Sequence, residues 1–113
     1  MSILSTLFGI KTSQNDAISV LDSNEFKAQT LNKKVQLIDV RTANEFNSGH
    51  IKNAKNIDIF SSKFNVECCK FNKENAVYLY CQSGARSRQA STKLAAMGFI
   101  KIYDLRGGIS NYR

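Results

Sequence analysis

The chain has 113 residues, of which 42% are hydrophobic, and its sixteen Lys and Arg against nine Asp and Glu give a formal net charge of +7. This length and hydrophobic content are typical of one globular domain and exclude a disordered chain. No apolar run is long enough to span a membrane, so we expect no stable membrane insertion. The basic residues are spread along the sequence, which favours a solvated basic surface over nucleic-acid binding.

The cysteines indicate the compartment, and the first residues set the domain boundary. Three cysteines, two of them adjacent, argue against a disulfide framework and for a reducing compartment, so we expect a cytoplasmic location. Residues 1–15 are mildly apolar but lack the charged start and cleavage site of a secretory signal. We interpret them as an N-terminal arm, loose or packed as a short helix, with weak membrane-surface contact left open. Residues 16–113 are expected to form the domain.

The first predicted elements are a strand at Ile18–Leu21 and a helix behind it. Asp22 or Ser23 carries a side chain suited to cap that helix, which should run to about residue 31. The residues expected to face the core are Phe26, Thr30 and Leu31.

The next strand, Val35–Val40, is nearly all apolar, which predicts that both of its faces are covered. Asp39 is the exception near its end. Because an unpaired carboxylate is costly to bury, Asp39 needs a partner, and Arg41 and Arg86 are the two candidates.

A short helix should follow, because Thr42 and Glu45 have the spacing of a capping box. This helix is expected to run to about Asn47 or Ser48 and to end at Gly49. A further strand is expected at residues 54–57 and a helix at residues 61–69.

The second half of the chain contains an apolar and aromatic run, Val77–Tyr80, which predicts a buried strand. A turn at Ser83-Gly84 leads into a helical pattern that starts near Ser87. One face of this helix carries Ala90, Leu94 and Met97. Gly98 stands where a left-handed cap residue belongs, and Phe99 should fold back on Leu94.

Ile100, Ile102 and Tyr103 indicate a final strand, which Gly107-Gly108 breaks before a last helical turn. Strands that alternate with helices imply an α/β fold with parallel pairing and right-handed crossovers. In such sheets chemistry collects at the carboxyl ends of the strands. The reactive side chains near such ends are Asp39, Cys81 and Asp104.

Cys81 is the candidate nucleophile. The small residues that follow it allow successive backbone amides to turn towards the sulfur, and Arg86 and a helix N-terminus add positive potential. Such surroundings lower the pKa of a thiol, and the thiolate is the nucleophilic form. A cysteine at the end of a buried strand can also be a small hydrophobic residue, but the whole loop favours the reactive interpretation.

Three segments, residues 37–51, 81–87 and 105–108, together resemble the single-domain rhodaneses. The first contains Asp-Val-Arg, then Glu45-Phe46 and Gly-His-Ile, similar to the family's DVR…E(F/Y)…GHI segment. The second is similar to its active-site loop and the third, Leu-Arg-Gly-Gly, to its closing L-x-G-G. The resemblance covers the chain from about Ile18 to Tyr112. It implies a rhodanese-like fold with a small, mostly parallel sheet of about five strands flanked by helices on both faces.

The resemblance implies a sulfurtransferase. Cys81 would take the outer sulfur of a small anionic donor such as thiosulfate as a persulfide and pass it to cyanide or a thiol, or to a partner protein of a sulfur relay. Asp39 and Arg41 would support the site, and no cofactor or metal is implied. The loop that would cradle the persulfide consists of Gln82, Ser83, Gly84, Ala85, Arg86 and Ser87.

Two other functions are weighed against this one. A phosphatase or arsenate reductase of the related type uses a roomier Cys-x5-Arg loop, whereas the spacing here is Cys-x4-Arg. A non-catalytic rhodanese-like binding module commonly lacks the loop cysteine, which this chain keeps. The family pattern also departs at Lys52-Asn53, where Gly or Pro is usual, and at Tyr112, where Trp is common, which affects only local packing.

The remaining cysteines and the single histidine are expected to have mainly structural roles. His50 is either a general base or, as we favour, a structural residue, and Arg41 is expected to be a structural or rim residue. Cys68 and Cys69 offer a resolving thiol or, as we favour, helix packing. None of these cysteines has CxxC spacing, so we expect no metal site.

Overall fold

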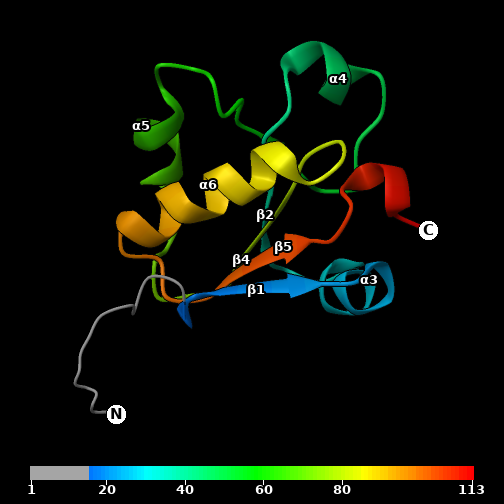
Figure 1. The fold of residues 1–113 in the computed structure, drawn as a ribbon, viewed down its shortest axis with the longest axis horizontal. Helices are drawn as coiled ribbons and strands as arrows, with labels where there is room; N and C mark the ends of the chain where they lie inside the picture. Colours follow the sequence, from blue (N-terminus) through cyan, green and yellow to red (C-terminus); the bar gives the residue numbers. More distant parts are fainter. Residues whose placement is uncertain (1–15) are drawn as a thin grey trace.

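The computed structural model describes residues 16–113, so the arm expected for residues 1–15 lies outside the described part of the chain. The strands form one sheet in the order β1-β5-β4-β2-β3, and all neighbouring strands are parallel (Figure 1). The strands are β1 (Ile18–Leu21), β2 (Gln36–Asp39), β3 (Lys55–Asn56), β4 (Val77–Tyr80) and β5 (Ile102–Leu105). The predicted α/β fold with five parallel strands is confirmed.

Helices cover both faces of this sheet. They are α3 (Ser23–Thr30), α4 (Ala43–Asn47), α5 (Phe64–Cys68), α6 (Ala85–Ala96) and the 3-10 turn η1 (Ile109–Asn111). Successive side chains of β4 point to opposite faces. Val77 and Leu79 pack in one apolar cluster with residues of α5 and α6, and Tyr78 and Tyr80 pack in a second cluster with Phe26 of α3. The central strands therefore supply two cores, which explains why they are apolar throughout.

The strand order brings the predicted reactive residues to one edge of the sheet. β4 lies between β2 and β5, with Asp39 paired to Tyr80 on one side and Leu79 paired to Asp104 on the other. Cys81 follows Tyr80 directly. The carboxyl ends of three adjacent strands thus place Asp39, Cys81 and Asp104 in neighbouring positions, as the α/β pattern predicts.

Helix α3 begins and packs as predicted, but it ends one residue early. Asp22 is its N-cap and accepts a hydrogen bond from the Glu25 amide at 2.9 Å. Phe26 and Thr30 are buried. The expectation that Leu31 faces the core is wrong, because the helix ends at Thr30 and the extended backbone at Leu31 leaves its side chain 41% exposed.

The end of α6 confirms the predicted cap, whereas the following strand starts later than expected. Gly98 has φ +105°, and the Phe99 amide donates to the Leu94 carbonyl at 3.1 Å, so Phe99 folds back into the core. Ile100 is still part of this turn, and its side chain is 56% exposed. The strand begins at Ile102, where pairing with β1 and β4 becomes available.

Other predicted boundaries shift by a few residues. β2 and β3 are shorter than the segments predicted for them, residues 35–40 and 54–57. α5 begins at Phe64 because residues 61–64 form a separate turn, closed by a hydrogen bond from the Phe64 amide to the Ser61 carbonyl. α6 begins at Ala85 rather than near Ser87. The last residues form the expected helical turn, η1.

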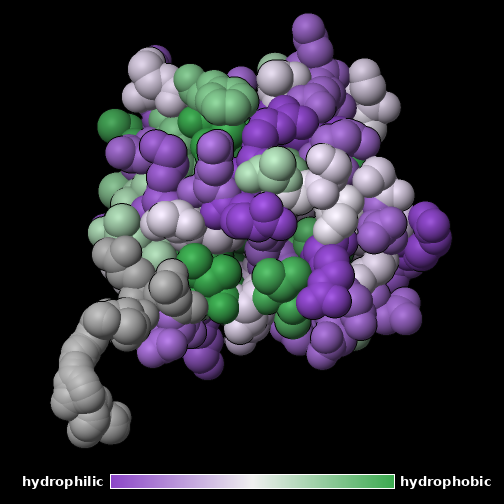
Figure 2. All heavy atoms as spheres, viewed as in Figure 1, coloured by the Kyte–Doolittle hydropathy of each residue, from purple (hydrophilic) through white to green (hydrophobic). Residues whose placement is uncertain are grey.

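The surface is mainly hydrophilic on the face shown in Figure 2, where apolar residues gather over β1, whose Val20 is 48% exposed. Within residues 16–113, no helix combines the length and the apolar character that crossing a bilayer requires.

Candidate active site

The loop after β4 turns its backbone towards the sulfur of Cys81. Gly84 has φ +111° and is the residue from which α6 starts. The Gly84 amide donates a hydrogen bond to Cys81 Sγ at 3.0 Å, and Ser87 Oγ lies 3.5 Å from the same sulfur. A positive φ favours glycine, so this residue allows the sharp change from strand to helix. The loop thus forms a nest around one buried thiol.

This environment favours ionisation of Cys81. Burial of the thiol opposes ionisation, but hydrogen bonds from the Ser87 hydroxyl and from the backbone amides of Ser87, Gly84 and Ser83 outweigh burial, so the pKa of Cys81 is lowered. The sulfur also lies at the N-terminal end of α6, where the helix dipole favours negative charge. The inward-facing amides are what the sequence predicts for this loop, and they can stabilise a thiolate or any other anionic sulfur.

Arg86 pairs with Glu45 and not with Asp39. Its two terminal nitrogens donate to the two carboxylate oxygens of Glu45 at 2.7 and 2.9 Å. Glu45 is also the capping-box residue of α4, because its Oε1 accepts the Thr42 amide while Thr42 Oγ1 accepts the Glu45 amide. Mainly because of Arg86, the pKa of Glu45 is lowered to about 2. One carboxylate therefore ties the start of α4 to the start of α6.

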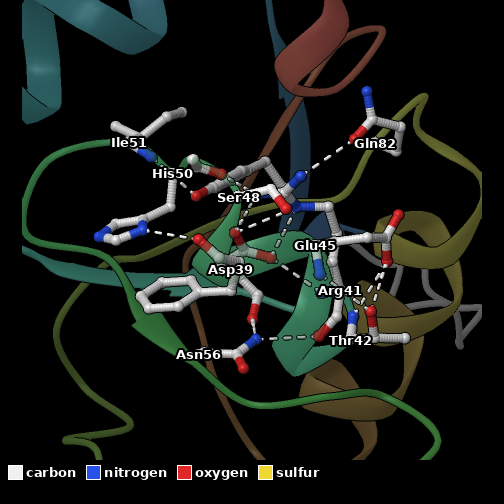
Figure 3. Close-up of polar contacts among 12 residues, drawn as sticks. Asp39, Arg41, Thr42, Glu45, Ser48, His50, Ile51, Asn56 and Gln82 are labelled. Atoms are coloured by element: carbon white, nitrogen blue, oxygen red, sulfur yellow. Dashed lines mark hydrogen bonds and ion pairs between the residues drawn. The ribbon is translucent and has the colours of Figure 1, made fainter.

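Asp39 and Arg41 form a buried ion pair that reaches the loop (Figure 3). Arg41 donates to both Asp39 oxygens, at 3.1 Å from Nε and 2.7 Å from Nη2. Its Nη1 donates to Gln82 Oε1 at 3.0 Å, and its Nη2 donates to the Gly49 carbonyl at 2.7 Å. The hydrogen bond to Asp39 raises the pKa of Arg41. Of the two partners considered for Asp39, Arg41 is therefore the one present.

Arg41 is a structural residue rather than a rim residue, since it is only 4% exposed. The Asn56 side chain of β3 reinforces this region by donating to the Asp39 and Arg41 carbonyls, at 3.0 and 2.9 Å. Because the Arg41 guanidinium contacts Gln82, the first residue of the loop is fixed to the end of β2 (Figure 3). Arg41 has no hydrogen bond to the sulfur of Cys81, so it acts on the loop through its contact with Gln82.

The Gly107-Gly108 turn closes the far side of the loop. The Ile109 amide donates to the Cys81 carbonyl at 2.9 Å, and the Ser110 amide donates to the Gln82 carbonyl at 3.2 Å. A Cβ at Gly108 would meet the Gln82 backbone and would lie 2.7 Å from the Cys81 carbonyl oxygen. The third sequence segment thus packs directly on the backbone of the second.

We expect Gly108→Ala to destabilise the protein by about 2–4 kcal/mol, because it adds a left-handed backbone penalty to a clash with backbone that cannot rotate away. Urea unfolding monitored by circular dichroism measures this change. Gly49→Ala is the matched control, since Gly49 also has a positive φ, +148°, but an added Cβ there has no atom within 4 Å. Equal losses in the two variants would contradict the close packing at Gly108.

His50 and the other two cysteines lie apart from this hydrogen-bond network. The His50 ring stacks on Phe46 with centroids 3.7 Å apart, and its Nδ1 lies 2.9 Å from the Phe46 carbonyl, which fits the structural role favoured for it. Cys68 is fully buried in the core, and burial raises its pKa to about 12. Cys69 is exposed, and both thiols are free. Among residues 16–113 no cluster of three His, Cys, Asp or Glu has metal-site geometry.

Two residues of this site go beyond the sequence prediction. Glu45 is predicted only as a helix cap, although the family's E(F/Y) motif was a signal that it does more. Asp104 is predicted only to lie near a strand end, and the structure places it beneath Ser87, 6% exposed. Burial raises the pKa of Asp104 from 3.8 to about 6.

The raised pKa of Asp104 predicts a pH-dependent stability. The folded state favours the protonated carboxyl, so this contribution is fully present below pH 3.8 and is lost as the pH rises through about 6. The difference between the two pKa values corresponds to at most about 3 kcal/mol. We therefore expect Asp104→Asn to match the wild type near pH 4 and to be more stable at pH 8, in urea titrations at both values. Glu74→Gln, at an exposed carboxylate, should change stability little at either pH.

Comparison with known proteins places the chain in a family. A model of the Rhodanese-like domain family matches residues 22–113. The uncharacterized protein YqhL of Bacillus subtilis is 38% identical over 99 residues, which are 88% of this chain and 75% of that protein. The thiosulfate sulfurtransferase GlpE of Shewanella oneidensis is 32% identical over 94 residues, which are 80% of this chain and 87% of that enzyme.

Larger proteins match as well. The tRNA uridine(34) hydroxylase of Aster yellows witches'-broom phytoplasma is 33% identical over 101 residues, which are 86% of this chain, but the match spans only 33% of the hydroxylase. Among solved structures, a rhodanese-like domain protein from Staphylococcus aureus superposes with a TM-score of 0.73 at 32% identity, covering 84% of this chain and 91% of that one. The sheet order, the loop around Cys81 and these matches agree, and the chain belongs to the rhodanese-like domain family.

Proposed function

We propose that this protein is a sulfurtransferase that carries a sulfane sulfur on Cys81. The observation that supports this most directly is the ring of backbone amides and the Ser87 hydroxyl around the Cys81 sulfur, with the Gly84 amide at 3.0 Å. These donors are neutral backbone amides and a hydroxyl group, and together they can hold an anion in place. A persulfide carries its negative charge on the outer sulfur atom, next to such donors.

The proposed reaction has two steps. The Cys81 thiolate attacks the outer sulfur of thiosulfate, a bond forms between the two sulfur atoms, and the S–S bond of thiosulfate breaks to release sulfite. The Cys81 persulfide then gives its outer sulfur to an acceptor. Cyanide is converted to thiocyanate and a thiolate acceptor to a new persulfide. In both cases the Cys81 thiolate is the leaving group and is regenerated. The sulfane sulfur keeps its oxidation level in both steps, and atoms and charge balance, so the reaction as written uses no external oxidant or reductant.

The position of Arg86 supports sulfur transfer over phosphate chemistry. In a cysteine-based phosphatase the loop arginine has to bind the phosphate oxygens. Here both terminal nitrogens of Arg86 are bound to Glu45, so the guanidinium is committed to a carboxylate. The short Cys81-to-Arg86 spacing also leaves room for a sulfur atom rather than for a tetrahedral oxyanion.

The relatives support the same class of activity. GlpE of Shewanella oneidensis, which is named a thiosulfate sulfurtransferase, matches this chain along 87% of its own length. The hydroxylase match is confined to a third of that protein, so it supports a shared domain rather than a shared reaction. We place the protein in the cytoplasm, acting on a small anionic donor that its net charge of +7 attracts. A thiol, cyanide or a partner protein of a sulfur relay is the acceptor, and nucleic acid is no substrate.

Incubation with thiosulfate followed by intact-protein mass spectrometry tests the proposal. We expect one added sulfur atom, which peptide mapping places on Cys81 and which a thiol reductant removes. Cys69 is the internal control, because it is exposed but lies outside the amide nest. If no sulfur is added, or if Cys69 is modified as readily as Cys81, the binding-module alternative is the better description. Turnover of p-nitrophenyl phosphate would support a phosphatase instead.

A further inference from the structure

Asp104 is a buried acid that the proposed sulfur transfer leaves without a role. It lies on β5, with Val20 of β1 and Leu79 of β4 in the neighbouring register positions. α6 packs over it and presents Ser87 and Ser91, one helical turn apart and both buried. Asp104 Oδ1 and Ser91 Oγ have no hydrogen-bond partner within residues 16–113. A buried carboxylate with a free oxygen is costly, so its position beneath the reactive loop calls for an explanation.

Ser87 connects this acid to the reactive sulfur. In the protonated form of the site, the Cys81 thiol donates to Ser87 Oγ at 3.5 Å, and the Ser87 hydroxyl donates to the Gly84 carbonyl at 3.3 Å. The same hydroxyl lies close enough to Asp104 to lower the pKa of its carboxyl group. A serine hydroxyl has one proton to donate. The Cys81 thiolate, the Gly84 carbonyl and the Asp104 carboxylate therefore compete for it.

We infer that Asp104 is a positioning residue that sets the acidity of Cys81 by controlling where the Ser87 hydroxyl donates its proton. When Asp104 is ionised, it attracts this proton away from the sulfur and adds a like charge nearby, so the thiolate is disfavoured. When Asp104 is protonated, its own O–H can donate to Ser87 Oγ, and the Ser87 proton is free to turn towards the thiolate. The two acids are thus coupled through one hydroxyl group, and each opposes ionisation of the other.

The other groups around Asp104 leave this coupling in place. Arg88, which directly follows Ser87 on α6, favours its ionised form. The strand neighbours Val20 and Leu79 carry no titratable group. Asp104 also lines a cavity of about 510 Å³ that reaches Ser83 and Arg106, which gives solvent protons a route to the carboxyl group. Burial nevertheless raises the pKa of Asp104 to about 6, whereas the hydrogen bonds of the loop lower the pKa of Cys81, so the two pKa values shift towards each other.

The inference deepens the proposed function, because it names a residue that adjusts the nucleophile of that reaction. Its test does not require sulfur transfer. Alkylation of Cys81 by iodoacetamide requires the thiolate but no sulfur donor or acceptor, and peptide mass spectrometry separates it from alkylation of the exposed Cys69. A failure of sulfur transfer would therefore leave this measurement intact, and the reverse also holds.

We expect Asp104→Asn to raise the rate of Cys81 alkylation at pH 6 by about three- to tenfold. The plot of this rate against pH should then fit the titration of a single group. In the wild type, the rate of Cys81 alkylation should rise more gradually across pH 5–7, since the ionisation of Asp104 opposes that of Cys81. Glu74→Gln removes an exposed carboxylate before β4 and should leave the profile unchanged. In a Ser87→Ala background the effect of Asp104→Asn should shrink to less than half, because the connecting proton is absent.

Three results would overturn the inference. An unchanged alkylation profile in Asp104→Asn would show that the acid does not influence the thiol. An equal shift in Glu74→Gln would reduce the effect to overall charge. A full effect of Asp104→Asn in the Ser87→Ala background would show a direct electrostatic interaction instead of a shared proton. Circular dichroism and the urea titrations proposed above confirm that each variant is folded before alkylation is interpreted.

Discussion

Replacement of Cys81 by serine is expected to reduce thiocyanate formation from thiosulfate and cyanide by about a thousandfold or more, to the uncatalysed rate. A hydroxyl group in the same nest remains protonated at neutral pH and forms no persulfide. The amides around Cys81 Sγ would still bind an anion, so binding of the donor should survive the loss of chemistry. The rate with a thiol acceptor should fall by the same factor, because both acceptors take sulfur from one intermediate.

The matched control for this prediction is Cys69→Ser. Cys69 is exposed and has no hydrogen bond to the loop, so its replacement should leave the rate within about twofold of the wild type. Cys68 is a poorer control, because it is fully buried and its replacement would perturb the core. Residual turnover in Cys81→Ser, or a loss of turnover in Cys69→Ser, would contradict the assignment of the nucleophile.

The second large effect is expected at Arg41. Arg41→Met should destabilise the protein by about 3–5 kcal/mol, since it leaves the fully buried Asp39 carboxylate without its counter-charge. Sulfur loading of Cys81 in the folded fraction should also slow, because the hydrogen bond from Arg41 to Gln82 fixes the start of the loop. Urea unfolding measures the loss of stability. The rate of sulfur loading, measured at urea concentrations at which the variant is still folded, shows the effect on the loop.

A second variant separates the ion pair from the loop contact. Asp39→Leu combined with Arg41→Met removes both charges, and we expect it to recover most of the lost stability because no buried charge is left unpaired. It should not recover the rate of sulfur loading, as Gln82 still lacks its partner. Lys70→Met breaks the exposed Lys70–Glu67 pair and should cost less than about 1 kcal/mol. A similar cost in Lys70→Met and Arg41→Met would contradict the special role of burial.

The sequence predicts elements best where one local signal decides them. The apolar run of Val77–Tyr80 can only be buried on both faces, and the spacing of Thr42 and Glu45 specifies a capping box that the structure contains. Gly98 and Phe99 close α6 for a similar reason, since the left-handed residue and its apolar neighbour are adjacent in the chain.

The sequence fails where several distant segments compete for one residue. Leu31 and Ile100 are apolar, yet both lie where the chain leaves an element and turns, so pattern alone assigned them wrongly. Asp39 has two candidate arginines, and only the three-dimensional arrangement shows that Arg86 is already bound to Glu45. Asp104 gains its importance from its place beneath Ser87, which no spacing along the chain encodes.

The double role of Glu45 links parts of the chain that would otherwise change independently. Its carboxylate serves Thr42 in the cap of α4 and Arg86 at the start of α6. Substitutions at Thr42 and Arg86 therefore act on one shared group, and their energetic effects cannot simply add. This predicts epistasis between two positions that lie far apart in the sequence. The cost of losing the cap depends on whether the arginine is present, and a homologue that replaces Glu45 needs compensating changes at both helix ends.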